Sequence, residues 1–472
     1  MSKAENGGRP RVRLPRETGP SFGRYGATDF RDEGALLLEP LYQAARPKIA
    51  VHVRQLQDAR TLRDLFEAER ALLVEFAARQ RVADTLPGQR DRLEREIRKL
   101  ASKGSRNEMV ETQRQLDVIK RQQQVSRSLQ HALRRIADGL AWKALRYDRL
   151  AIAVFGQGRR VGRLSAGVGF EAELAAMESF WERGILAIHN DMTNVLRHGD
   201  LTAVRWPRGG DLEVDVVEVK AGRADPGSAQ MRRIGAAIEF LQKGEHPSLA
   251  DGERLTALRL PQRYRTFQTG LRDVIGKARR KGFAWVSPSP AIAIMVIDFT
   301  RAGGRVPEIV QPGHEAMERR LGWWSAGKPL PFVWGSGLQR MQDRRETVAG
   351  IAPFSIFRFP PEDVADILLG FVDYIVYLND PVLELMFARE GIQARVARPP
   401  ESERIFLTAR RGSAEIHVPA ALRQQMMIEL MTPASLIVSV NGALAAAARQ
   451  SDRPKWLVVF AEESSVWGAG SP

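Results

Sequence analysis

A long helical pattern runs from Gln89 to Tyr147 and is interrupted once, at Lys103-Gly104-Ser105. Arg, Lys, Glu and Gln occupy most of its faces. A helix that is polar on nearly all sides cannot be buried in a globular core, and it needs a partner helix or many side-chain pairs to be stable. The segment therefore predicts a long helical hairpin or a short coiled coil. We favour packing, or assembly with a second copy or a partner subunit, over direct contact with DNA.

The sequence on either side of this segment indicates that the chain is divided into separate structural units. Residues 1–50 mix Gly, Pro, Arg and Ser with little periodicity, which predicts a basic, poorly ordered arm. A first helical pattern begins near residue 58, and Pro87-Gly88 should end it. The expected units are the arm over 1–50, a helical hairpin or coiled coil over 51–150, an α/β core over 151–304 and a C-terminal α/β accessory region over 305–472.

Composition limits the chemistry that the chain can perform. Its 472 residues contain no cysteine, which excludes disulfides, thiol nucleophiles and zinc sites built on cysteine. No apolar run approaches the roughly 18 to 20 residues of a membrane span, and the N-terminus lacks the apolar stretch of a secretory signal. We therefore expect a cytoplasmic protein with no membrane contact. The net charge of +15 favours a polyanionic partner such as nucleic acid.

Two β-type runs flank a turn-forming segment in the middle of the chain. The runs are 201–206 and 212–220, and the Pro- and Gly-rich segment 207–211 separates them, which predicts a β-hairpin. If 207–211 is the loop, counting outward in antiparallel register places Asp200 directly opposite Glu218. The sequence therefore predicts two carboxylates as cross-strand neighbours.

Facing carboxylates repel each other on a sheet, and half-burying them raises the cost unless a cation lies between them. Lys220 falls on the same strand face as Glu218 and supplies one positive charge. A divalent cation held by Asp200 and Glu218 would supply the rest, and oxygen ligands suit Mg²⁺ or Mn²⁺. The hairpin therefore predicts a metal site.

The order of these features resembles the PD-(D/E)XK, or restriction-endonuclease-like, nuclease superfamily. A helix bearing Glu precedes a strand that opens with Asp, and a hairpin then leads to a strand ending in Glu218-Val219-Lys220 before another helix. The resemblance implies a mixed sheet flanked by helices. It also implies that Asp200, Glu218 and the carbonyl of Val219 bind the metal, while Lys220 polarises the attacking water and steadies charge on the phosphate.

The same resemblance, which covers residues 165–300, implies further site residues. Many members carry a Glu on the preceding helix, where Glu173 is suitably placed, and some carry a Gln on the following helix, where Gln230 is suitably placed. The chain departs from the family pattern before Asp200, where it has Gly199 and not Pro.

Basic residues accumulate after the hairpin, and Tyr264 and Phe267 lie among them. Such a patch beside the candidate site suits phosphate contacts with occasional base stacking. The apolar run 291–298 predicts a buried strand of the nuclease sheet. The residues that we expect to contact DNA are Arg232, Arg233, Arg263, Arg265, Lys277, Arg279 and Arg280.

The region 305–472 is expected to be α/β, and its sequence assigns it no activity. A helical pattern covers 363–378. Strand-like runs follow at 404–407, 414–418 and 456–460.

Taken together, these patterns favour a Mg²⁺-dependent nuclease that hydrolyses phosphodiester bonds in DNA. A role in bacterial restriction or antiphage defence is an analogy at the level of the fold. Two alternatives stay open. The first is a catalytically inactive nucleic-acid-binding or scaffold protein that keeps a nuclease-like fold, and the second is a coiled-coil subunit of a larger assembly that works through residues 89–147.

Overall fold

The computed structural model shows an α/β protein in which long helices and small sheets share one apolar core. The strands of the described residues form four sheets. No helix in that part of the chain is long and apolar enough to cross a membrane. The structure describes residues 37, 39–156, 168–207, 212–219, 235, 238–239, 245–250, 253–260, 265–302, 315, 332–333, 351–397, 405–449 and 455–460.

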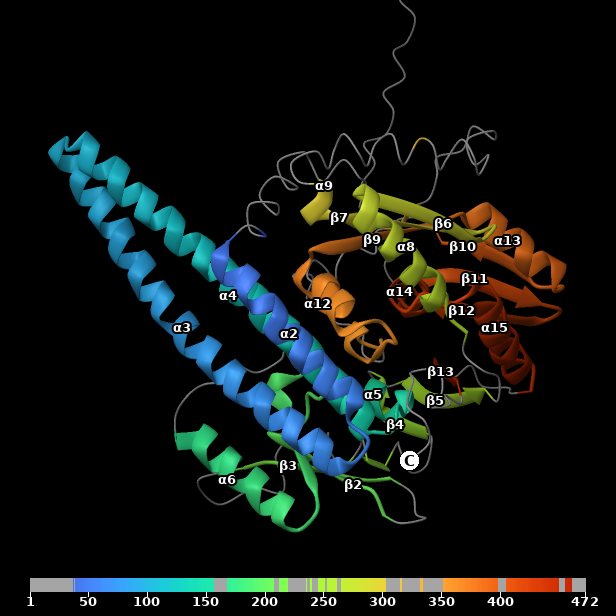
Figure 1. Ribbon diagram of the computed structural model, residues 1–472. Coiled ribbons are helices and arrows are strands. Elements are labelled where there is room, and N and C mark those ends of the chain that lie inside the picture. Colours follow the sequence, from blue (N-terminus) through green and yellow to red (C-terminus); the bar gives the residue numbers. More distant parts are fainter. Residues whose placement is uncertain are drawn as a thin grey trace, which may run out of the picture.

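Two long paired helices form the hairpin that the sequence predicts. α3 (Leu62–Lys103) packs along α4 (Arg106–Ala144), and Gly104 ends α3 with a φ of 74°, which glycine adopts without strain. A capping box between Thr61 and Asp64 starts α3. In Figure 1 the end at which α3 passes into α4 projects away from the sheets. The predicted interruption at Gly104 is confirmed.

The predicted helix end at Pro87-Gly88 is wrong, because α3 continues through both residues. Proline removes one hydrogen bond from a helix interior, which on its own would end or kink a helix. Here α3 packs continuously on α4, and the neighbouring Leu86 is buried at 3% exposure. Tertiary packing supplies most of the stability of such a helix, so it outweighs the local break.

Part of the predicted N-terminal arm is also ordered. Residues 40–50 lie in α2 (Pro40–Asp58), which packs against α4 and buries Tyr42, Ala45 and Ile49. This part of the prediction is wrong because the few apolar residues there fall on one helical face. Residues 1–36 of the arm lie outside the described residues.

The predicted β-hairpin belongs to an antiparallel sheet of order β1-β2-β3. Helix α6 (Val168–Glu182) contacts β1 and β2, and α3 contacts β1. A single turn of 3₁₀ helix, η2 (Asn190–Met192), follows β1. The strands are β1 (Leu186–His189), β2 (Leu201–Arg205) and β3 (Glu213–Val217).

A second sheet has the order β6-β7-β9-β8. α8 (Gln268–Lys281) contacts β6 and β7, and α12 (Pro361–Leu369) contacts β9. The strands are β6 (Phe283–Ser289), β7 (Ile292–Asp298), β8 (Phe332–Val333) and β9 (Val372–Leu378).

This second sheet corrects two predictions. The run 291–298 does form a strand, but β7 pairs with β6 and β9 and not with the hairpin, so its assignment to the nuclease sheet is wrong. The sheet therefore crosses the unit boundary predicted at residue 304. The pattern over 363–378 is a helix followed by a strand, because Gly370 with a φ of 77° ends α12. A continuous apolar run does not by itself distinguish a buried strand from a buried helix.

Two more sheets complete the described strands, and they confirm the strand-like runs expected at 404–407, 414–418 and 456–460. One is antiparallel, with β10 (Gln393–Val396), β11 (Ile405–Arg411) and β12 (Ala414–Pro419). In the other, β5 (Glu253–Leu260) lies between β4 (Glu245–Ala250) and a parallel β13 (Lys455–Phe460). The further helices are α5 (Arg149–Phe155), α9 (Phe299–Ala302), η5 (Phe354–Ile356), α13 (Asp380–Arg389), α14 (Ala420–Ile428) and α15 (Pro433–Ala447).

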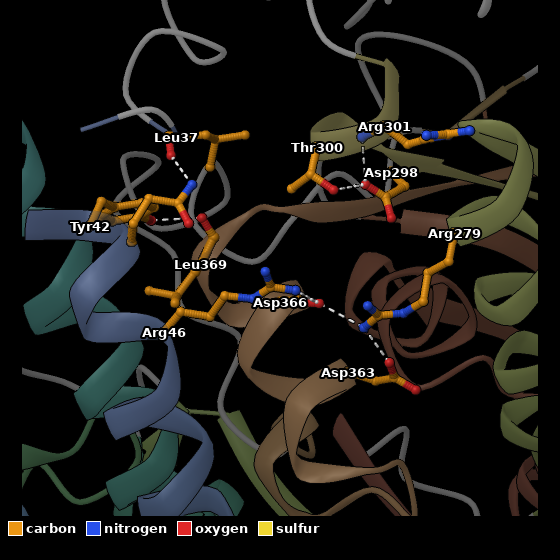
Figure 2. Close-up of polar contacts among 11 residues, drawn as sticks. Leu37, Tyr42, Arg46, Arg279, Asp298, Thr300, Arg301, Asp363, Asp366 and Leu369 are labelled. Carbon is orange, nitrogen blue, oxygen red and sulfur yellow. Dashed lines mark hydrogen bonds and ion pairs between the residues drawn. The ribbon is translucent and has the colours of Figure 1, made fainter. Parts of the chain in front are cut away.

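The buried carboxylate of Asp366 joins the three helices α2, α8 and α12 (Figure 2). Arg46 of α2 donates to Asp366 of α12 from Nε at 2.5 Å and from Nη2 at 2.7 Å. Arg279 of α8 binds the same carboxylate at 2.6 Å and also binds Asp363. Burial raises the pKa of Asp366, whose side chain is 1% exposed, although both arginines lower it. One anion thus holds α2, α8 and α12 together.

Candidate functional site

The two strands of the β-hairpin, β2 and β3, pair in the predicted register. Leu201 pairs with Val217, so Asp200 and Glu218 lie next to this pair, where β2 begins and β3 ends. The backbone N–H of Asp200 donates to the carbonyl of Val217 at 2.9 Å, which is one residue out of that register, so the regular ladder ends at Leu201. The register predicted for the two strands is confirmed, and the Glu218 carboxylate acts electrostatically on Asp200.

Gly199 shapes the entry to this position. Its φ of 69° lies in the left-handed region, and a Cβ there would come within 2.6 Å of Val216 Cγ1 and 2.8 Å of the Val217 carbonyl oxygen. Both facts require glycine, because other residues are strained at this φ and real Cβ atoms do not approach backbone so closely. The departure from the family pattern before Asp200 therefore has a local structural reason.

Asn190 and Val219 fix Asp200 from two sides. The Asn190 backbone N–H donates to the Asp200 carbonyl at 2.9 Å, and its side-chain amide donates to the His198 carbonyl at 2.6 Å. The Asn190 Oδ1 accepts from Thr202 Oγ1 at 2.8 Å. The Val219 backbone N–H donates to Asp200 Oδ2 at 2.7 Å. These bonds hold the Asp200 carboxylate against the end of β3.

Negative charge is concentrated around Asp200. Burial is the largest cause that raises the pKa of Asp200, and the carboxylates of Glu173, Glu218 and Asp191 raise it further. The hydrogen bond from Val219 lowers it without cancelling these effects. The ionised Asp200 is therefore the costly form in the metal-free protein, and a cation beside it would relieve that cost.

Glu173 is joined to a buried histidine and, through it, to the long hairpin. Glu173 Oε2 lies 2.7 Å from Nε2 of His189, the last residue of β1. The backbone N–H of His189 donates to Glu69 Oε1 of α3 at 2.9 Å. Burial raises the pKa of Glu69 to about 8, so this carboxyl is largely protonated at neutral pH. The site thus includes one residue contributed by α3.

The sequence analysis did not predict several residues of this site, among them Glu69, His189, Asn190 and Asp191. Glu69 lies 120 positions before His189, so only the tertiary fold brings them together. Its signal in the sequence is a carboxylate on the apolar face of α3, where Ala68 and Leu72 are also buried. His189 carries a clearer signal, since it closes a short apolar run that could have been read as a strand.

The residues to which the resemblance assigns metal-binding oxygen atoms lie just before β2 and just after β3. These oxygen atoms belong to the carboxylates of Asp200 and Glu218 and to the carbonyl of Val219. Among the described residues, no group of three His, Asp or Glu side chains is arranged to hold a metal ion. Two carboxylates and one carbonyl do not need such a group, because Mg²⁺ keeps several water ligands. The crowding of carboxylates at Asp200 fits a divalent cation.

The predicted DNA contacts divide into three classes. Arg265, Lys277 and Arg280 are exposed. Arg279 is bound to Asp363 and Asp366, so its guanidinium is engaged in the fold and not offered to phosphate. Figure 1 shows α8 over the second sheet and apart from α6 and β3. The expectation that this basic helix lies beside the β-hairpin is therefore wrong. Lys220, Gln230, Arg232, Arg233 and Arg263 lie outside the described residues.

We found no protein-family model, no curated protein and no solved structure that matches the chain. We therefore infer its function from the residues of the site.

Proposed function

We propose that the chain is a Mg²⁺-dependent nuclease that hydrolyses phosphodiester bonds in DNA. One observation carries this proposal: Asp200 and Glu218 lie next to the last residue pair of β2 and β3, and the charges of Glu173 on α6 and of Glu218 act on Asp200. The helix with Glu173, Asp200 just before β2, and Glu218 just after β3 follow one another in the order of the superfamily that the sequence resembles. The net charge of +15 suits a polyanionic substrate.

The residues of the chain would divide the chemistry by position. Asp200, Glu218 and the Val219 carbonyl would hold the cation, which supplies an activated water and neutralises charge that develops on the phosphate. Glu173 adds negative charge near Asp200 and so favours cation binding. Lys220 follows Val219 in the sequence, and the resemblance assigns it to the attacking water and the phosphate charge.

Cleavage of plasmid and of single-stranded DNA with Mg²⁺, with Mn²⁺ and with EDTA tests this proposal. We expect metal-dependent cleavage by the wild type, and a loss of about 100-fold or more in Asp200→Asn and in Lys220→Ala, as for other charge-stabilising groups. Asp215→Asn is the matched control. Asp215 is an exposed carboxylate of β3 that alternation places on the opposite face from Glu218, so cleavage should be unchanged.

Two results would count against the proposal. Cleavage that persists in Asp200→Asn would remove Asp200 from the metal site. DNA binding without cleavage under every metal condition would instead favour a scaffold that keeps the hairpin but performs no hydrolysis.

A further inference from the structure

The long hairpin carries a row of cations that pair with no carboxylate in the described part of the chain. Arg92, Arg95, Lys99 and Lys103 lie on α3 and are all exposed. At about 100° per residue they fall within an arc of about 80° on one helical face. None of them forms an ion pair with any residue that the structure describes. We name these four residues the basic stripe.

Several other arginines of the hairpin are neutralised locally, unlike the four residues of the basic stripe. Four of these other arginines have a carboxylate within ion-pair distance. At the margin of the stripe lies only Glu96, by the same angular count. Four cations against one carboxylate leave a strong local excess of positive charge. The neutralised pairs are Arg63 with Glu67, Arg90 with Glu94, Arg114 with Glu111 and Arg121 with Glu39.

The place and length of the basic stripe suit a large, rod-shaped anion. It lies in the half of α3 that leads into α4, the end of the pair that projects away from the sheets in Figure 1. At 1.5 Å per residue, positions 92–103 cover about 17 Å, which exceeds the roughly 12 Å width of the DNA major groove. Such a row can meet phosphates on both sides of a groove. No Asn, Gln or aromatic residue occurs over 92–103, which favours backbone contact over base reading.

We propose that the basic stripe binds the phosphate backbone of duplex DNA, without sequence preference and independently of the metal site. The hairpin then serves as an arm that holds DNA on the enzyme. This assignment differs from a solvated helix face in one measurable property. Each phosphate that the stripe neutralises releases counterions, so binding must weaken steeply with salt.

A pair of matched variants tests the proposal. Both remove four positive charges from the same hairpin, and glutamine keeps helix propensity in both. Binding to a 30-base-pair duplex is measured by fluorescence anisotropy over a salt series, with EDTA present to prevent cleavage. The stripe variant carries Arg92→Gln, Arg95→Gln, Lys99→Gln and Lys103→Gln, and the control carries Arg63→Gln, Arg90→Gln, Arg114→Gln and Arg121→Gln.

We expect the stripe variant to lose about 3 from the slope of log K against log salt, at about 0.9 per phosphate contact, and to bind at least tenfold more weakly at low salt. The control should keep the slope of the wild type. A charge-preserving variant, Arg92→Lys with Arg95→Lys, should also bind as the wild type does. Circular dichroism confirms that each variant keeps its helices.

Three outcomes would overturn the proposal: an unchanged slope in the stripe variant, an equal loss in the stripe and control variants, and stronger binding to anionic lipid vesicles than to duplex DNA. Because EDTA is present throughout, these outcomes do not depend on the metal site. Conversely, a protein that binds DNA through the stripe but never cleaves it would refute the nuclease proposal alone.

Discussion

At the scale of single residues, Gly199 should be the least tolerant position of the site. Gly199→Ala adds a Cβ within 2.6 Å of Val216 Cγ1 and 2.8 Å of the Val217 carbonyl, and it imposes a left-handed φ on alanine. We expect a loss of about 2–4 kcal/mol in the free energy of unfolding and weaker cleavage. Gly184→Ala is the control, since its φ is 71° but nothing lies within 4 Å of its Cβ. Equal losses of unfolding free energy in Gly199→Ala and Gly184→Ala, measured by urea denaturation, would contradict a steric role for Gly199.

Glu69 predicts a pH dependence of stability. Its pKa is raised from 4.5 to about 8 by burial, so the folded state keeps a proton that the unfolded chain has lost. Stability is therefore full below about pH 4.5, declines up to about pH 8 and then levels off. Glu69→Gln should remove this decline, which amounts to about 1.4 kcal/mol per pH unit for one proton. Urea denaturation between pH 5 and pH 9 measures it.

The exposed neighbour Glu67 supplies the control for this experiment. Its side chain is 64% exposed and pairs with Arg63, so Glu67→Gln should leave the pH profile as in the wild type. A Glu69→Gln protein that loses stability with rising pH as steeply as the wild type would show that another group titrates.

The candidate site shows which residue contacts a sequence can predict. β2 and β3 are close in the sequence, and the two-residue period of strands fixes their register, so counting was sufficient for these two strands. Glu69 and His189 meet only because α3 packs on β1, and no local rule relates positions so far apart. Arg279 looked like one basic residue among many, and its role depended on the buried carboxylate of Asp366, which the sequence does not place nearby.

At the scale of elements, one pair of helices allows buried and exposed ion pairs to be compared. Arg46–Asp366 and Arg54–Glu362 both join α2 to α12, but Asp366 is 1% exposed and Glu362 is 56% exposed. We expect Asp366→Ala to cost roughly 2–4 kcal/mol, since it removes the shared partner of two arginines. Glu362→Ala should cost less than about 1 kcal/mol and respond more to salt. Similar decreases in unfolding temperature for Asp366→Ala and Glu362→Ala would contradict this ranking.

Elements were predicted well where their signals are local. The end of α3 at Gly104 follows from the ability of glycine to adopt a left-handed conformation. The β-hairpin of β2 and β3 follows from the turn-forming residues between them. The helix through Pro87 and the partners of β7 depend on packing with distant segments, as do the buried residues of α2. Propensity gives a weak preference that tertiary contacts outweigh.

At the scale of the whole molecule, the sheet of the candidate site is built onto the long hairpin. The buried Asp138 of α4 accepts from the Asn194 backbone N–H at 2.5 Å and from its side-chain amide at 2.9 Å. Trp206, just after β2, donates from Nε1 to the Ala144 carbonyl at 2.8 Å. Together with Glu69, these contacts tie the end of β1, the β1–β2 connection and the residue after β2 to the helical hairpin. Stability and site geometry should therefore change together.

Because stability and site geometry are coupled, a substitution at Asp200 tests whether the site gains its metal ligand at the cost of fold stability. A raised pKa means that the ionised carboxylate destabilises the metal-free fold above the unfolded pKa of 3.8. At pH 7 in EDTA, Asp200→Asn should therefore be more stable than the wild type. Mg²⁺ should reverse this order, since a cation at 100 times its Kd stabilises the wild type by about 2.7 kcal/mol.

Thermal unfolding with EDTA and with Mg²⁺ measures both effects in one series. Asp215→Asn serves as the control and should show the Mg²⁺ response of the wild type, because Asp215 is exposed and pairs with Ala203 away from the hairpin end. An Asp200→Asn protein that is less stable than the wild type in EDTA, or that keeps the full Mg²⁺ response, would refute the assignment of Asp200 as a metal ligand. The combination of higher metal-free stability and lost metal response is expected only if the carboxylates were gathered to hold a cation, since a purely structural aspartate would show neither.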